Sequence, residues 1–315
     1  MVAIQTYICS QDRILFSVPT NPWISAARPR TLPLALASIG MGASLAASVQ
    51  QFRWSVFLLS ALTTIFLQIL SNLANDYGDS VHGADYEGRE GPARAVQSGS
   101  ITAEAMKRAI ALFAGLSLGS GIALLWIALP GSQTTFLLFL VLGLLAIGAA
   151  ITYTSGGKPY GYAGLGDVSV LIFFGLVGVM GSYYLHTLRW QWVHILPALS
   201  CGFFSTAVLN VNNIRDINAD KVAGKRSIPV RLGRKRAVIY HWTLLIAGIS
   251  CSIAYVLLDF NSYYQWLFVL CLPLLIRNGQ AVQERRTAAE LDPYLKQMAL
   301  TTLLYVVTFG LGLLL

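Results

Sequence analysis

Residues 109–157 read AIALFAGLSLGSGIALLWIALPGSQTTFLLFLVLGLLAIGAAITYTSGG and contain no Asp, Glu, Lys or Arg. A helix crosses the hydrocarbon core of a bilayer with about 20 mostly apolar residues, so this stretch is too long for one crossing. Near its middle stand Pro130, Gly131, Ser132 and Gln133, which favour a turn. The stretch therefore predicts two membrane-spanning helices joined by a tight hairpin.

Shorter uncharged stretches recur through the chain of 315 residues, of which only 11% are charged and 55% are hydrophobic. A soluble domain carries roughly a quarter charged residues. No β-barrel alternation is present, so helices must satisfy the backbone polar groups. Together with the hairpin, these stretches predict an all-α polytopic membrane protein of nine spans, with residues 1–21 as a cytoplasmic segment and 22–315 as a single transmembrane domain. The stretches lie at 31–52, 54–75, 168–188, 190–214, 237–258, 260–276 and 297–315.

The charges are distributed unevenly between the two sides of this topology. Of the 22 Lys and Arg residues, all but Arg53 and Arg189 fall on one side, which the positive-inside rule makes cytoplasmic. The N-terminus is then predicted inside and the C-terminus outside. All of the 14 acidic residues except Asp259 lie on the same side. The positive-inside rule does not explain these carboxylates, whereas a reaction chamber opening to the cytoplasm does.

Two polar motifs end predicted spans on that side, at 72–79 and 210–220. In the first, Asn72, Asn75 or Asp76, and Asp79 fall at helical spacing on one face; in the second, Asn213, Asp216 and Asp220 do the same. Each motif ends the second span of a four-span block. This placement predicts two parallel four-helix repeats followed by a ninth helix, with a site between the halves.

Paired aspartates facing each other indicate divalent metal chemistry. Mg²⁺ takes oxygen ligands and typically joins one or two protein carboxylates to substrate phosphates. Two Asp pairs could therefore hold Mg²⁺ around a diphosphate and neutralise the charge that develops on it as a leaving group. The neighbouring basic residues would contact its phosphate oxygens; they are Arg89, Arg94, Lys158, Arg215, Lys225 and Arg226.

With these motifs the sequence resembles the UbiA-type intramembrane prenyltransferases, and most closely the branch that acts on 1,4-dihydroxy-2-naphthoate in menaquinone synthesis. The likeness extends over about residues 22 to 315. It rests on the segments 28–33 (RPRTLP), 70–79 (LSNLANDYGD), 91–94 (GPAR), 153–158 (YTSGGK), 159–167 (PYGYAGLGD) and 208–216 (VLNVNNIRD).

The resemblance implies a nine-helix bundle in a bacterial cytoplasmic membrane. It implies a Mg²⁺-dependent transfer of a polyprenyl chain from its diphosphate onto the dihydroxynaphthoate ring, with loss of CO₂. The metal ligands would be Asp76, Asp79, Asp216 and Asp220. Asn72, Asn75 and Asn213 would support these ligands and bind the diphosphate. Tyr153, Lys158 and Arg215 would be catalytic residues.

Some assignments stay open. Tyr153 is either a catalytic aromatic residue or an anchor at the membrane boundary. Relatives that act on 4-hydroxybenzoate have a third Asp four residues after the position of Asp79, where this chain has Gly83, so a metal role for Asp85 is undecided. His82 is the one histidine close to the motifs, and a proton-transfer role for it is undecided as well.

Other functions remain as alternatives. They are prenyl transfer to another aromatic acceptor, a membrane transporter, and a CDP-alcohol phosphotransferase. The last requires Asp-Gly where this chain has Asp79-Ser80. Binding of nucleic acid is not expected, because basic and acidic residues alternate on the membrane-facing side.

Overall fold

The computed structural model describes residues 21–81 and 94–315, and within these ranges it contains helices and no strand. The elements are α1 (Pro22–Ala27), η1 (Pro29–Thr31), α2 (Leu32–Ser48), α3 (Trp54–Val81), α4 (Ala103–Ala128), α5 (Gln133–Thr152), α6 (Gly166–Val170), η2 (Leu171–Gly181), α7 (Ser182–Thr187), η3 (Trp192–His194), α8 (Ile195–Arg215), α9 (Ile217–Val222), α10 (Ile228–Leu258), η4 (Tyr263–Cys271), α11 (Leu272–Glu284) and α12 (Ala288–Leu314).

The predicted hairpin within 109–157 is confirmed. Helix α4 ends at Ala128 and α5 begins at Gln133, and Gly131 adopts a φ of 86° in the turn between them. A left-handed φ of this kind carries no Cβ penalty at glycine. The turn therefore forms where the two strongest turn-forming residues interrupt an apolar sequence.

Eight helices in the described ranges are long and apolar enough to cross a membrane. The all-helical membrane fold is thus confirmed. The predicted span at 260–276 is not among the eight, because η4 continues into α11 and α11 carries Arg277, Asn278 and Gln280 within its turns. Polar residues lower the mean hydropathy of this segment as a whole.

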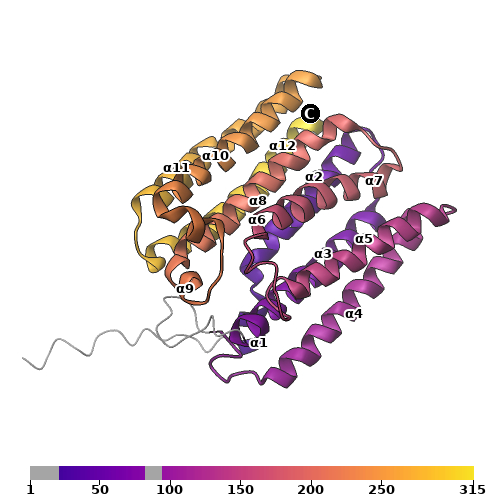
Figure 1. Ribbon diagram of the computed structural model, residues 1–315. Coiled ribbons are helices and arrows are strands. Elements are labelled where there is room, and N and C mark those ends of the chain that lie inside the picture. Colours follow the sequence, from indigo (N-terminus) through magenta and orange to yellow (C-terminus); the bar gives the residue numbers. More distant parts are fainter. Residues whose placement is uncertain (1–20, 82–93) are drawn as a thin grey trace, which may run out of the picture.

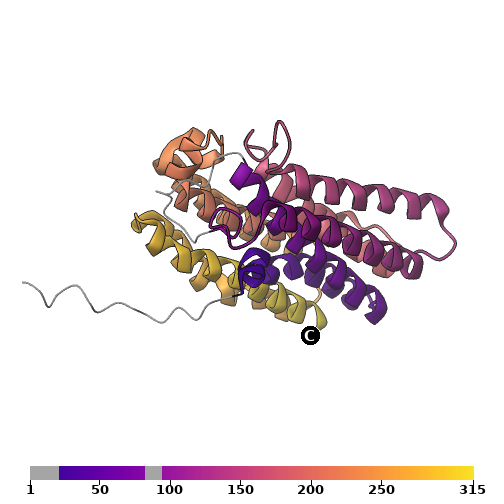
Figure 2. The same ribbon diagram turned by 90° about the horizontal axis from the view of Figure 1, so that it is seen from below.

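The long helices lie side by side in one bundle, with α4 and α10 at opposite edges (Figures 1 and 2). Helix α2 lies in the interior and packs against α3, η2, α8 and α12. The largest apolar core joins α2, η2, α8, α10 and α12, around fully buried side chains such as Met41, Phe204 and Phe309. In contrast, α5 has no buried residue, which suits a helix facing lipid on one side and a cavity on the other.

The short helices α1 and α9 gather at one end of the bundle (Figure 1). The polar ends of α3 and α8 finish at this end. Helix α10 also begins here, and Gly233, with a φ of 74°, interrupts its helical geometry shortly after its start. The fold thus brings both aspartate motifs to the same end of the bundle, although 140 residues separate Asp76 from Asp216 in the sequence.

Candidate active site

A cavity of about 450 Å³ opens between the two motifs and extends into the bundle. Its wall at the motif end is polar and includes Asn72, Asp79, Asp216 and Asp220. Deeper in the bundle the wall becomes apolar, with residues of α4, α5 and η2. The apolar side chains include Leu118, Ile122, Phe139, Leu142, Ile147, Phe173 and Val177. One cavity therefore offers a charged mouth and a hydrocarbon-lined interior.

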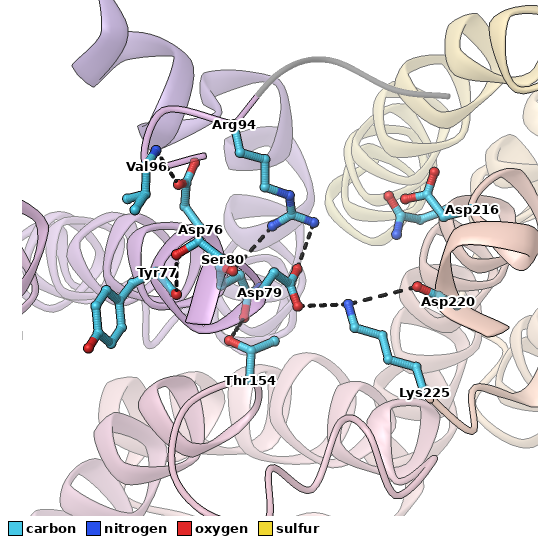
Figure 3. Close-up of polar contacts among 12 residues, drawn as sticks. Asp76, Tyr77, Asp79, Ser80, Arg94, Val96, Thr154, Asp216, Asp220 and Lys225 are labelled. Carbon is cyan, nitrogen blue, oxygen red and sulfur yellow. Dashed lines mark hydrogen bonds and ion pairs between the residues drawn. The ribbon is translucent and has the colours of Figure 1, made fainter. Parts of the chain in front are cut away.

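Asp79 is the centre of the polar end (Figure 3). It is 2% exposed, and its Oδ2 lies 2.6 Å from a guanidinium nitrogen of Arg94. Its Oδ1 lies 2.8 Å from Nζ of Lys225 and accepts a hydrogen bond of 2.9 Å from the Tyr162 hydroxyl. Three donors from three loops thus converge on one buried carboxylate, which satisfies a charge that would otherwise be costly to bury.

Lys225 joins the first motif to the second. Its Nζ lies 3.8 Å from Oδ1 of Asp220, opposite its contact with Asp79, and 4.9 Å from the centre of the Tyr162 ring. Ser227 donates a hydrogen bond to Oδ2 of Asp220 at 3.2 Å. Burial raises the pKa of Asp220 to about 6; Asp216 and Asp79 raise it as well, while Lys225 lowers it. Asp220 therefore lies in a site that favours a bound cation.

Asp76 occupies a different position from its motif partner. Its carboxylate accepts hydrogen bonds from the backbone N–H groups of Ala95 and Val96, at 3.2 and 3.1 Å, and points toward that segment (Figure 3). It is not one of the residues that line the cavity. On α3 the cavity face instead runs through Asn72, Asn75 and Asp79. In this structure Asp76 holds the segment that carries Arg94.

Asp216 is held by the residue before it. Nε and an Nη atom of Arg215 each lie 2.8 Å from one oxygen of Asp216. Arg215 also contacts Asp292, at the start of α12, at 2.6 Å, and Arg30 lies 3.2 Å from the same carboxylate. Arg215 itself does not line the cavity. Its guanidinium fixes the direction of Asp216 and ties α8 to the first turns of α12.

The predicted amides are placed by neighbouring elements. Asn72 donates to the Ala27 carbonyl and to the Thr31 hydroxyl, at 2.8 and 3.0 Å. The Thr154 hydroxyl donates to the Asn75 side chain at 3.0 Å. Together with Asn213, both amides line the cavity at its polar end. All three predicted amides are therefore brought together.

The predicted residues after α5 divide into two groups. Tyr153 lines the cavity, and burial raises its pKa, with Asp167, Asp220 and Asp79 raising it further. Lys158 and Arg226 are exposed and do not line the cavity. The predicted role of Arg89, and the undecided roles of His82 and Asp85, lie outside the described residues.

Two contributors to the site were not singled out from the sequence. Tyr162 contacts both Asp79 and Lys225, and Asp292 contacts Arg215. Tyr162 lies in the glycine-rich segment that follows Lys158, and no local pattern there distinguishes it from Tyr160. Asp292 stands in the polar stretch before the last span, and nothing local distinguishes it from other solvated acids.

The donor atoms fit Mg²⁺. Asp79, Asp216 and Asp220 offer carboxylate oxygens, which hard divalent cations prefer. The ammonium of Lys225 already lies between Asp79 and Asp220, which demonstrates room for positive charge between the motifs. Across the ranges described, no three His, Cys, Asp or Glu side chains converge closely enough to hold an ion by themselves. Phosphate oxygens of a substrate would have to complete the coordination.

Comparison with known proteins gives consistent matches. The family model described as the UbiA prenyltransferase family matches residues 35–313. Two relatives are 1,4-dihydroxy-2-naphthoate octaprenyltransferases, from Haemophilus influenzae at 48% identity and from Escherichia coli at 46%; each alignment covers 93% of this chain and 95% of the relative. The enzyme of the same name from Mycobacterium tuberculosis is 36% identical, over 90% of this chain and 93% of its own.

Solved structures show the same fold at low identity. A UbiA homolog from Aeropyrum pernix K1 superposes with a TM-score of 0.64 at 18% identity, covering 90% of this chain and 96% of its own. A UbiA homolog from Archaeoglobus fulgidus, bound to DMAPP and Mg²⁺, superposes with a TM-score of 0.63 at 15% identity, over 93% of this chain and 99% of its own.

Proposed function

The chain belongs to the UbiA prenyltransferase family, and on that premise we propose that it transfers a polyprenyl chain from polyprenyl diphosphate to 1,4-dihydroxy-2-naphthoate. Diphosphate and CO₂ are released, and the product, demethylmenaquinol, belongs to menaquinone biosynthesis. The observation that carries the proposal is the meeting of Asp79, Lys225 and Asp220 at the mouth of an apolar cavity.

In the proposed function the diphosphate binds at the polar mouth of the cavity. Arg94 and Lys225 line the cavity together with Arg28, and both contact Asp79, so a phosphate group entering the mouth would meet two donors in fixed positions. The amides of Asn72, Asn75 and Asn213 border the same space. Lys158 and Arg226 stand beside lining residues in the same loops, and as exposed bases they attract the anionic substrate toward the mouth.

Asp79, Asp216 and Asp220 would hold Mg²⁺, and Asp76 would join them only by giving up the hydrogen bonds from Ala95 and Val96. When bound, Mg²⁺ neutralises the charge that develops on the departing diphosphate. Arg215 sets the direction of Asp216 through two contacts of 2.8 Å. In the proposed site these side chains would supply charge beside the C–O bond that breaks.

The apolar interior is the proposed site of the polyprenyl chain. Leu118, Phe139, Phe173 and other hydrocarbon side chains line it, and burial of isoprenoid surface contributes about 25 cal/mol for each Å² removed from water. Tyr153 borders the space between this interior and the carboxylates. In the proposed reaction its ring would stabilise positive charge on the departing prenyl carbon.

We also propose the finer topology: nine spans, formed by two parallel four-helix repeats and α12, in one domain over 22–315. Equivalent helices pack in the same way in the two halves, since α3 packs along α4 as α8 packs along α10. The proposed location is a bacterial cytoplasmic membrane. The charge asymmetry supports a cytoplasmic cavity mouth, a cytoplasmic segment 1–21 and an external C-terminus.

We expect Gly78→Ala to lower the transfer rate more than tenfold. A Cβ at Gly78 would lie 2.5 Å from the carbonyl oxygen of Thr154, so the end of α3 would have to move and carry Asp79 with it. Gly115→Ala is the matched control, because a Cβ there has nothing within 4 Å and α4 stays undisturbed. Initial rates of both variants test the expectation, which an unchanged rate in Gly78→Ala contradicts.

Mg²⁺ dependence should shift with pH. The pKa of Asp220 is raised from 3.8 to about 6, so its carboxylate gains a proton as the pH falls through that value and no longer offers a charged ligand. The Mg²⁺ concentration for half-maximal rate should therefore rise below about pH 6 and stay level above pH 7. Titrations at several pH values measure it; a Mg²⁺ requirement independent of pH would remove Asp220 from the metal site.

The proposed reaction is tested with purified protein, Mg²⁺, polyprenyl diphosphates of several lengths, and a panel of aromatic acceptors. With dihydroxynaphthoate as the acceptor, we expect prenylated naphthoquinol, diphosphate and CO₂ to form in equal amounts. Product with 4-hydroxybenzoate instead would support another acceptor within the family. Absence of product with every pair, together with substrate uptake into proteoliposomes, would favour a transporter.

A further inference from the structure

A buried carboxylate lines the cavity without belonging to either aspartate motif. Asp167, the second residue of α6, is 7% exposed and is one of the lining residues. Its Oδ1 accepts a hydrogen bond of 3.1 Å from the hydroxyl of Tyr240 on α10. Within the described part of the chain, no Lys or Arg forms an ion pair with it. Burying a charged carboxylate without an ion partner costs free energy, so a buried acid of this kind is a candidate for a functional role.

Tyr153 lies close to Asp167 at the polar end of the cavity. A Cβ built on Gly166, the neighbour of Asp167, would lie 2.7 Å from the Tyr153 hydroxyl oxygen. The charges of Asp167, Asp220 and Asp79 all act on that hydroxyl. Tyr153 therefore lies beside the start of α6 and lines the same cavity as Asp167, Asp79 and Asp220. A substrate ring beside the diphosphate would have Asp167 within its surroundings.

We propose that Asp167 is a catalytic residue that accepts the proton of the acceptor hydroxyl next to the attacked carbon and later returns it. This inference rests on the proposed function. The acceptor carries hydroxyl donors, and a carboxylate with one oxygen fixed by Tyr240 retains acceptor capacity toward the cavity. A carboxylate at Asp167 repels the acceptor's own carboxylate and accepts a hydrogen bond from its hydroxyl.

The electrons and protons of this step balance. The C–O bond of the allylic diphosphate breaks, and its electron pair leaves with the diphosphate. A ring π pair forms the C–C bond at the carbon that bears the carboxylate, and the adjacent hydroxyl passes its proton to Asp167, leaving a ketone. The bond to CO₂ then breaks, its pair restores the aromatic ring, and the oxygen takes the proton back from Asp167. No other co-reactant is required.

The structure supplies a matched control. Tyr255, also on α10, donates a hydrogen bond of 3.1 Å to Asp259, which lies outside the cavity. The pair reproduces the Tyr240–Asp167 contact far from the mouth. Asp259→Asn therefore removes an equivalent charge from an equivalent partner, and its transfer rate should remain within about twofold of the wild-type rate.

The test compares wild type, Asp167→Asn, Asp167→Glu and Asp259→Asn in steady-state transfer, and measures Mg²⁺-dependent binding of an unreactive prenyl thiolodiphosphate. We expect Asp167→Asn to lower kcat about 100-fold or more, the usual range for a lost general base, with unchanged analogue binding and partial recovery in Asp167→Glu. Transfer within twofold of wild type in Asp167→Asn would overturn the inference. So would weakened analogue binding, which would make Asp167 part of the diphosphate site. If wild type itself yields no product with dihydroxynaphthoate, the proposed function fails first.

Discussion

Replacing Asp79 by Asn should lower the rate of prenyl transfer by about 1,000-fold. The substitution keeps the shape of the side chain but removes its charge, which Arg94, Lys225 and Tyr162 all contact. It removes a proposed metal ligand and also takes one counter-charge away from Arg94 and Lys225. Loss of one group that stabilises transition-state charge typically lowers the rate 10²- to 10³-fold. Asp79 is both a proposed metal ligand and a counter-charge for two bases, so we expect an effect at the upper end of this range. The initial rate in detergent or proteoliposomes measures the effect.

Glu104→Gln is the control for this variant. Glu104 is exposed and pairs with Arg108 on the surface of α4, so its loss changes the net charge equally and leaves the cavity intact. Surface pairs of this kind contribute little to stability. Asp79→Asn with more than a tenth of wild-type activity, alongside a normal Glu104→Gln, would show that the carboxylate at the centre of Figure 3 is not needed for the reaction.

Removal of Mg²⁺ is the second change with a large expected effect. Excess EDTA should lower transfer by about 1,000-fold, and added Mg²⁺ should restore it. The physical reason is that Asp79 already offsets part of the charge of Arg94 and Lys225, so these two bases alone do not neutralise a diphosphate. Metal ions are the usual means of stabilising such a leaving group. Circular dichroism during the titration should stay constant, because helix packing does not depend on the ion.

Transfer that continues in excess chelator would contradict this expectation. It would mean that the protein's own bases suffice for the leaving group. Helical signal lost along with activity would point instead to a metal that supports the fold.

The sequence predicted the membrane fold because the signal is local. The run at 109–157 is apolar throughout, and its one interruption contains Pro130 and Gly131, so both helices and the turn follow from composition. The segment at 260–276 was less predictable. Its apolar residues form η4, and the helix then continues through Arg277 and Asn278, so the uncharged run and the helix have different limits.

The sequence predicted which helix faces form the candidate site, but not which side chains on those faces point into the cavity. Helical spacing put either Asn75 or Asp76 beside Asp79, and only the packing of 94–96 on α3 decides that Asp76 turns away from the cavity. Helical spacing also could not predict contacts between segments that are distant in the sequence. Tyr162 meets Asp79 across 83 residues and Asp292 meets Arg215 across 77, and no local periodicity encodes such pairs.

The central claim is that the two aspartate motifs form one Mg²⁺-dependent diphosphate site, and binding of an unreactive prenyl thiolodiphosphate tests it most directly. Calorimetry on wild type, Asp79→Asn and Asp216→Asn, each with Mg²⁺ and with EDTA, separates the motifs and the metal. We predict binding to wild type only with Mg²⁺, and affinity at least about tenfold weaker in both variants. Equal affinity with and without Mg²⁺, or wild-type affinity in either variant, would contradict a shared site.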